Sequence, residues 1–152
     1  MRIFMRIFLY KKRSIYMQVT LIKNPDISAG LPYKVARIVY AHTGGISLPL
    51  VEAFTSMIKN LSTVTGQEIQ KLITNPKYFS VLDSADKNHY RIKVSANDTK
   101  FQMCVRTAQR MISGMLGDCC FGATKFHSAD IIPEWARSRG YIADIDGILF
   151  YT

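Results

Sequence analysis

The side chains with the most distinctive chemistry in this 152-residue chain are three cysteines, Cys104, Cys119 and Cys120. Because three is an odd number, at most one disulfide can form within the chain. A bridge from Cys104 to Cys119 or Cys120 would close a loop of about 15 residues and stabilise the fold by roughly 3 kcal/mol. The alternative, which we favour, is that all three are ordinary small apolar side chains. No C-x-x-C or paired-histidine spacing is present, so we expect no metal site.

The net charge of +9 comes mostly from the N-terminus. Residues 1–25 carry six basic and no acidic side chains, whereas residues 26–152 carry 14 basic and 11 acidic ones. A nucleic-acid-binding domain carries basic residues through its fold, interleaved with stacking aromatics, and the body of this chain does not. We therefore expect no nucleic-acid partner. Residues 1–24 are interpreted as a basic extension, either a solvated tail or an arm that attracts anions.

The same N-terminal segment does not have the layout of a secretory signal. It repeats Met-Arg-Ile-Phe at residues 1–4 and 5–8, basic residues interrupt each apolar stretch, and no small-residue cleavage site follows. A mis-called start, with Met5 or Met17 as the true first residue, and a degenerate leader both remain open. No run of 18 apolar residues occurs, so we expect no transmembrane segment.

Residues 25–152 have the length and composition of one domain. Apolar spacing and capping residues predict three helices first: one from Leu31 ended by Gly44–Gly45, one capped by Ser47, and a short one from a Thr65–Glu68 capping box. A strand at Tyr90–Val94 and a helix from Asp98 to Gly117 follow. The chain then has an extended segment at Gly122–His127, one helical turn at Pro133–Ala136 and a hairpin over Tyr141–Tyr151. This order predicts a mainly helical α+β fold with a small late β-hairpin or sheet.

Three motifs in this order resemble the cell-wall hydrolase family typified by the spore-cortex-lytic enzyme SleB. The first is Val35–Ser47, in which a helix ends in Tyr-Ala-His-Thr-Gly-Gly, followed by Val51-Glu-Ala53. The second is Gly122-Ala-Thr-Lys-Phe-His127 with Pro133-x-Trp-Ala136, and the third runs from Ile145 to Phe150–Tyr151. The resemblance covers about residues 31–151.

The resemblance implies a lysozyme-like domain whose groove binds peptidoglycan strands. It also implies cleavage of the β-1,4 bond between N-acetylmuramic acid and N-acetylglucosamine, by hydrolysis or lytic transglycosylation. In such enzymes a carboxylic acid at the end of the first helix protonates the leaving oxygen, then removes a proton from water or from the sugar's 6-hydroxyl. That acid needs a raised pKa to keep its proton near neutral pH.

This chain has His42 where the resemblance implies that glutamate. A histidine with an ordinary pKa of about 6.5 can move protons near neutrality, but its acid form is a cation. It also removes the negative charge that would stabilise an oxocarbenium-like transition state. Three interpretations follow: the fold is retained without activity, His42 itself carries altered catalysis, or another acid substitutes.

Three acidic residues could substitute for the missing glutamate. Glu52 lies ten residues after His42, and its context favours a residue that faces solvent or caps a neighbour. Asp130 and Glu134 flank the late motif and could approach a groove wall. Sequence spacing alone does not place any of them at a scissile bond.

Aromatic residues of the late motif are the expected sugar contacts. Phe126, His127 and Trp135 offer ring faces to pyranose C–H groups and polar tips to hydroxyls, and core packing is the alternative role for each. Tyr40 and Tyr151 are further candidates for the same cleft.

Two functions remain after the sequence is considered. The first is a peptidoglycan hydrolase or lytic transglycosylase, and the second is a catalytically inactive peptidoglycan-binding or envelope protein. Neither needs a metal or organic cofactor. The resemblance implies a cell-envelope or periplasmic location, and without a clear signal peptide cytoplasmic retention is the alternative.

Overall fold

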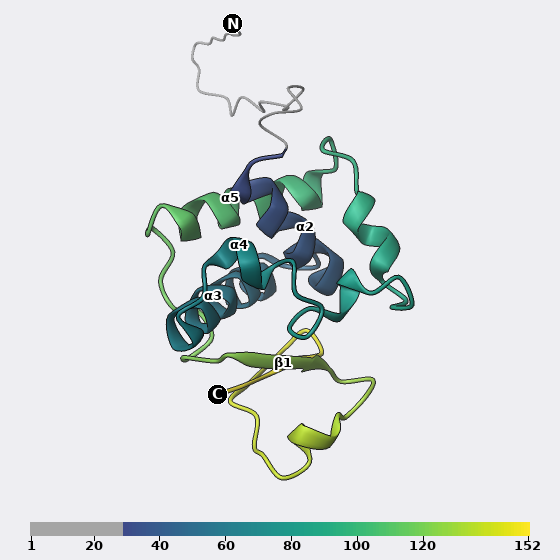
Figure 1. Cartoon of the computed structure of the whole chain (residues 1–152), viewed down its shortest axis with the longest axis vertical. Coiled ribbons are helices and arrows are strands. Elements are labelled where there is room, and N and C mark those ends of the chain that lie inside the picture. The colour runs from purple at the N-terminus through teal and green to yellow at the C-terminus, as the bar shows by residue number, and fades with distance from the viewer. Residues whose placement is uncertain (1–28) are drawn as a thin grey trace, which may run out of the picture.

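A computed structural model describes residues 29–152, so the basic extension at residues 1–24 lies outside the described residues. Three helices form the larger layer: α2 (Leu31–Thr43), α3 (Leu48–Thr65) and α5 (Thr99–Ile112). They pack against one another above a small sheet (Figure 1). Their apolar faces form one continuous cluster of fully buried side chains, which includes Val35, Phe54 and Phe101.

The predicted ends of these helices are confirmed. The Ser47 hydroxyl accepts a hydrogen bond from the Leu50 backbone N–H at 3.3 Å, and the Asp98 carboxylate accepts one from Phe101 N–H at 2.9 Å. Both bonds satisfy backbone donors that the first turn leaves free. Gly44 adopts a left-handed conformation with φ 67° and ends α2. These caps fix where α2 stops, and therefore where His42 lies.

Three predicted details were wrong. Thr65 is the last residue of α3 rather than part of a capping box, and the short helix α4 spans Ile69–Leu72. The expected strand at Tyr90–Val94 is the 3₁₀ helix η2 (His89–Lys93), which follows a second one, η1 (Ser80–Leu82). The helix expected to reach Gly117 ends at Ile112, because Gly114 has φ 78° and turns the chain away.

The late sheet contains β1 (Lys125–Ser128), β2 (Ala143–Ile145) and β3 (Ile148–Tyr151) in the antiparallel order β1-β3-β2. The predicted hairpin is confirmed: β2 and β3 are joined at Asp146 and Gly147, which both have positive φ. The chain is therefore an α+β protein, mostly helical, with a small three-stranded antiparallel sheet late in the sequence.

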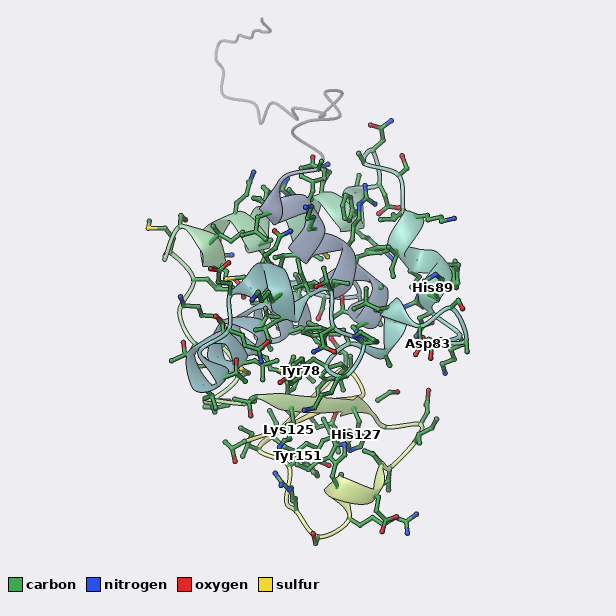
Figure 2. The ribbon with its side chains drawn as sticks, in the orientation of Figure 1. Tyr78, Asp83, His89, Lys125, His127 and Tyr151 are labelled. Carbon is green, nitrogen blue, oxygen red and sulfur yellow. The ribbon has the colours of Figure 1, made fainter. Side chains whose placement is uncertain are left out.

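The two faces of the sheet have different neighbours. Phe126 pairs with Phe150, and both pack against the helical core. Figure 2 shows Lys125, His127 and Tyr151 on the other side of β1, away from the helices. The last 3₁₀ helix, η3 (Glu134–Ala136), lies beyond that face. Because β1 is an edge strand, one row of its backbone groups faces outward between the helical layer and the η3 segment.

Candidate functional site

A cavity of about 370 Å³ opens beside β1, where the helical layer and the late segment meet. Its helical wall comes from the end of α2 and from residues 76–88, and its other wall from β1 and the segment leading to η3. The side chains and backbone that line it belong to His42, Pro76, Lys77, Tyr78, Ser80, Asp86, Lys87, Asn88, Phe126, His127, Ser128, Asp130, Ile131, Pro133, Trp135 and Ile148.

A second cavity of about 510 Å³ continues from the first. The two share four lining residues, Lys77, Tyr78, Phe126 and Trp135. The second cavity then extends over the C-terminal half of α3, where Met57, Leu61 and Val64 supply its apolar floor. Because the two cavities adjoin at their four shared residues, we call them together the β1 groove. Each part lies within the size range of small-molecule binding sites.

His42 lies on the helical wall of the β1 groove, inside a box of three phenylalanine rings. Its imidazole stacks on Phe54 with centroids 5.2 Å apart, meets the edge of Phe126 at 4.8 Å and lies 5.9 Å from Phe79. Its Nε2 atom is buried and has no hydrogen-bond partner. A buried polar atom without a hydrogen bond lowers the free energy of unfolding, so Nε2 of His42 makes the groove wall less stable.

Burial determines the charge of His42. Desolvation lowers the pKa of His42 to about 4, and the nearby carboxylate of Asp86 opposes this shift without cancelling it. The C-terminal end of α2 would favour an imidazolium, but that effect is small beside the loss of water. His42 is therefore a neutral imidazole at pH 7.

Asp86 is the carboxylate that sequence reasoning missed. It is half-buried, lines the β1 groove and acts electrostatically on His42. Its Oδ1 accepts a hydrogen bond from Asn88 N–H at 2.8 Å, which holds the side chain in a tight turn. The sequence marks this loop only as polar and exposed, and no spacing relates Asp86 to His42.

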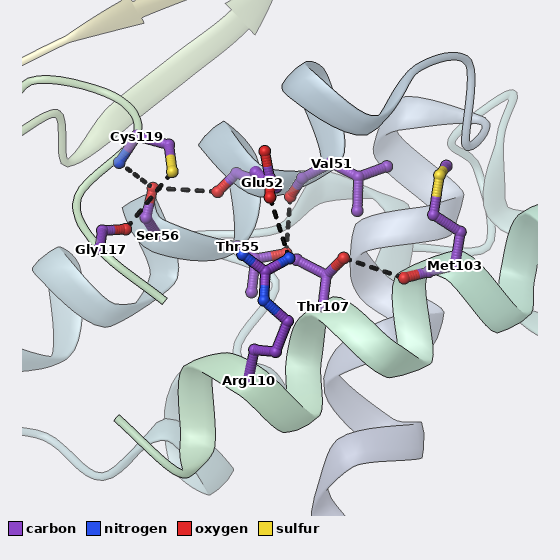
Figure 3. A network of polar contacts seen from close by, with 9 residues as sticks. All are labelled: Val51, Glu52, Thr55, Ser56, Met103, Thr107, Arg110, Gly117 and Cys119. Atoms are coloured by element: carbon purple, nitrogen blue, oxygen red, sulfur yellow. Dashed lines mark hydrogen bonds and ion pairs between the residues drawn. The ribbon is translucent and has the colours of Figure 1, made fainter. Parts of the chain in front are cut away.

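The three acids considered from sequence have different places. Glu52 points to α5, where it forms an ion pair with Arg110 at 2.9 Å, and it does not line the groove (Figure 3). Glu134 is exposed and pairs with Arg137. Asp130 does line the groove, but its carboxylate is 3.3 Å from the Lys87 ammonium. Of the three, only Asp130 shares the groove with His42.

The late aromatic residues form a second cluster on the outer wall. His127 stacks on Tyr151 at 5.3 Å, and Trp135 meets both rings edge-on at 5.8 and 5.1 Å. His127 Nδ1 lies 2.7 Å from the Ser128 carbonyl, which only accepts, so Nδ1 donates and Nε2 accepts from the Tyr151 hydroxyl at 2.8 Å. This network fixes the His127 ring and orients Trp135, which is 37% exposed in the groove.

Tyr40 lies outside the β1 groove, so the sequence interpretation of this residue is corrected. It packs edge-on against Phe101 and lines a separate hollow with Arg91 and Lys93. Tyr40 is two residues before His42 in α2, and residues two apart point to different sides of a helix. Four of the five proposed site residues, His42, Phe126, His127 and Trp135, do line the groove.

The cysteines of the described chain are all free. Burial raises the pKa of Cys104 to about 12 and that of Cys120 to about 11, so both are neutral thiols. The disulfide considered from sequence is therefore absent. Within residues 29–152 no group of three His, Cys, Asp or Glu side chains could hold a metal ion, and none of the helices there has the length and hydropathy to cross a bilayer.

Comparisons with known proteins found no match for this chain. No protein-family model, no curated protein and no solved structure is significantly similar to it.

Proposed function

We propose that this chain binds glycan strands of peptidoglycan in the β1 groove and performs no acid catalysis through position 42. The observation that supports this proposal is the state of His42. Its ring is packed among three phenylalanines, and its pKa of about 4 leaves it without the imidazolium proton that an acid catalyst would donate at pH 7. A glycosidic oxygen needs a proton donor as the bond breaks.

The shape and lining of the groove support a saccharide ligand. Two adjoining cavities suit a ligand of several sugar units, and exposed Trp135 with half-buried Tyr78 offers ring faces for pyranose C–H groups. The amide of Asn88 and the hydroxyl of Ser80 offer polar partners for sugar hydroxyls. On this proposal the chain is a SleB-like, lysozyme-like domain that acts in the cell envelope, where its ligand is found.

The test is co-sedimentation of the full chain with purified peptidoglycan sacculi, followed by mass spectrometry of the soluble fraction. We expect the protein in the pellet and no released muropeptides at pH 7. Trp135→Ala weakens binding, whereas Tyr141→Ala, which removes an exposed aromatic ring outside the groove, does not. Failure to sediment would contradict the binding function, and release of muropeptides by the wild type would contradict the loss of catalysis.

A second function, cleavage with Asp86 as the acid, is favoured by one observation. Asp86 lines the same groove beside His42 and is the groove carboxylate without an ion-pair partner among residues 29–152. Protonated Asp86 would donate its proton to the glycosidic oxygen as the C1–O bond breaks. The resulting carboxylate would then take a proton from water or from the 6-hydroxyl that attacks C1.

Paired variants test the second function. Asp83 and Asp86 each accept a hydrogen bond from the backbone N–H two residues later, at 2.9 and 2.8 Å, but only Asp86 lines the groove. Asp86→Asn and Asp83→Asn therefore make matched changes to the same loop. Cleavage that Asp86→Asn abolishes and Asp83→Asn retains would establish this function, and equal effects of the two would exclude it.

A further inference from the structure

The two ends of the β1 groove differ in charge. The end near His42 is lined by the acidic residues Asp86 and Asp130 and by the basic residues Lys77 and Lys87. The other end, over α3, is lined by Lys77, which both cavities share, and Lys125, and by no acidic side chain. A cavity with low-dielectric walls and charge of one sign concentrates the field that a ligand experiences.

Among residues 29–152, the two lysines at the α3 end have no carboxylate partner. The ion pairs found in residues 29–152 use Lys87, Arg110 and Arg137 instead. The Lys77 ammonium lies 5.6 Å from the centre of the Tyr78 ring, so this aromatic face holds the charge at the point where the two cavities join.

Lys125 comes from the opposite wall. It is the first residue of β1, and Figure 2 shows it on the same side of the strand as His127 and Tyr151, while Tyr78 lies on the side toward the helices. The two lysines therefore line the α3 end from different elements, the loop after α4 and the edge strand. A ligand that occupies this end meets two positive charges that no described side chain neutralises.

We propose that the α3 end of the β1 groove is a subsite for a carboxylate carried by the glycan, with Lys77 and Lys125 as its specificity-determining residues. This inference rests on the proposed function, because the groove must first bind a saccharide. Two carboxylates in peptidoglycan have this chemistry: the lactyl group of N-acetylmuramic acid and the carboxylates of its peptide stem. A neutral chitin-type strand has neither.

The residues that line this end fit a carboxylate better than a phosphodiester. Lysine provides a single point charge, and the groove end has no arginine fork for bidentate contact with phosphate. Its other residues are mostly apolar or aromatic, as expected for a sugar-binding cavity. Recognition of this kind contributes more to specificity than to affinity.

The intrinsic fluorescence of Trp135 provides the assay, since it is the only tryptophan of the chain and lines both cavities. The full chain is titrated with chitotetraose, with a peptide-free muramic acid oligosaccharide and with the same oligosaccharide carrying peptide stems. The test variant is Lys77→Gln/Lys125→Gln. The control is Lys34→Gln/Lys59→Gln, which removes two charges from exposed lysines of α2 and α3 outside both cavities.

We expect the test variant to weaken binding of the carboxylated ligands about five- to tenfold and to leave chitotetraose binding unchanged, since an exposed charge pair contributes modestly. The control variant matches the wild type. If the test variant already binds the peptide-free ligand more weakly, the bound carboxylate is the lactyl group. If it loses affinity only for the ligand with peptide stems, the bound carboxylate belongs to the peptide.

Three results would overturn the inference. Equal affinity for neutral and carboxylated strands, with no effect of the test variant, would refute the subsite while leaving the proposed function intact. If an oligonucleotide quenches the fluorescence of Trp135 equally well and its binding is lost in the test variant, the site binds anions without selectivity. No response to any saccharide would refute the proposed function and the subsite together.

Discussion

The imidazole of His42 lies nearly parallel to the ring of Phe54, with centroids 5.2 Å apart and an interplanar angle of 25°. This stacking places a titratable ring in the environment of a core aromatic. The protonation state of the groove wall at His42 therefore depends on how the ring is packed more than on its being a histidine.

The first prediction concerns stability and pH. The pKa of His42 falls to about 4 in the folded chain, against about 6.5 when unfolded, so between these values the unfolded chain binds more protons. The free energy of unfolding is therefore highest above pH 6.5 and falls by about 3 kcal/mol as the pH drops to 4. Urea denaturation across this range measures the slope.

His42→Phe tests the origin of that slope. The substitution removes the titrating group and the unpaired Nε2, so stability at pH 5 rises relative to the wild type and the pH dependence becomes flatter. His89→Gln, which changes a histidine outside the groove, is the control and retains the slope. A wild-type slope in the His42→Phe variant would show that another group titrates.

The second prediction is a gain of function at the same position. In His42→Glu the aromatic box raises the pKa of the new carboxyl group, which keeps it protonated near neutral pH. We expect release of muropeptides from peptidoglycan at about 100-fold or more above the wild-type rate, since a positioned acid contributes at least that much. Mass spectrometry also distinguishes hydrolysis from transglycosylation by the mass of the product.

His42→Gln is the matched control for this gain, because it has nearly the shape of glutamate without its proton chemistry. It should remain inactive. Activity in both variants, or in neither, would argue against an acid position at residue 42.

The third prediction concerns the outer wall. Tyr151→Phe removes the hydroxyl that donates to His127 Nε2 and leaves a buried acceptor unpaired, at a cost of about 1–3 kcal/mol in unfolding free energy. Chemical denaturation at pH 7 measures this loss. Tyr141→Phe removes an exposed hydroxyl and should change stability little. Equal stability of the Tyr151→Phe variant and the wild type would mean that water replaces the lost donor.

The fourth prediction concerns the turn after α2. Gly45 has φ 62°, and an added Cβ would lie 2.8 Å from the Lys100 Cβ in α5. Gly45→Ala therefore combines a left-handed backbone penalty of about 1–2 kcal/mol with a clash. Gly66→Ala has the backbone penalty alone, because nothing lies within 4 Å of its added Cβ. Thermal unfolding should rank Gly45→Ala as the less stable, and the reverse order would refute the clash.

Local signals predicted most of the fold. Ser47, Asp98 and the Asp146–Gly147 turn act within a few residues of their own position, so the sequence is enough to find them. The segment Tyr90–Val94 shows the limit. Its alternating pattern suits a strand, but the Arg37 guanidinium from α2 binds the carbonyls of Ile92 and Val94 at 3.0 Å and occupies acceptors that a neighbouring strand would need.

The groove could be predicted only in part, for a similar reason. Phe126, His127 and Trp135 belong to one short motif whose spacing brings them together. The lowered pKa of His42 depends on rings contributed by three distant segments, and the place of Asp86 depends on how its loop returns to α2. Such contacts between distant segments have no signature in a single sequence.

The walls of the β1 groove are linked by two kinds of contact that respond differently to conditions. The Lys87–Asp130 ion pair joins them at the mouth, but both side chains are mostly exposed, so salt screens an interaction that is already weak. The Phe126 ring, wedged against His42 and Phe54, joins them at the base. The width of the groove is therefore held by apolar contacts that charge screening does not weaken, and urea or cooling rather than added salt is the way to loosen it.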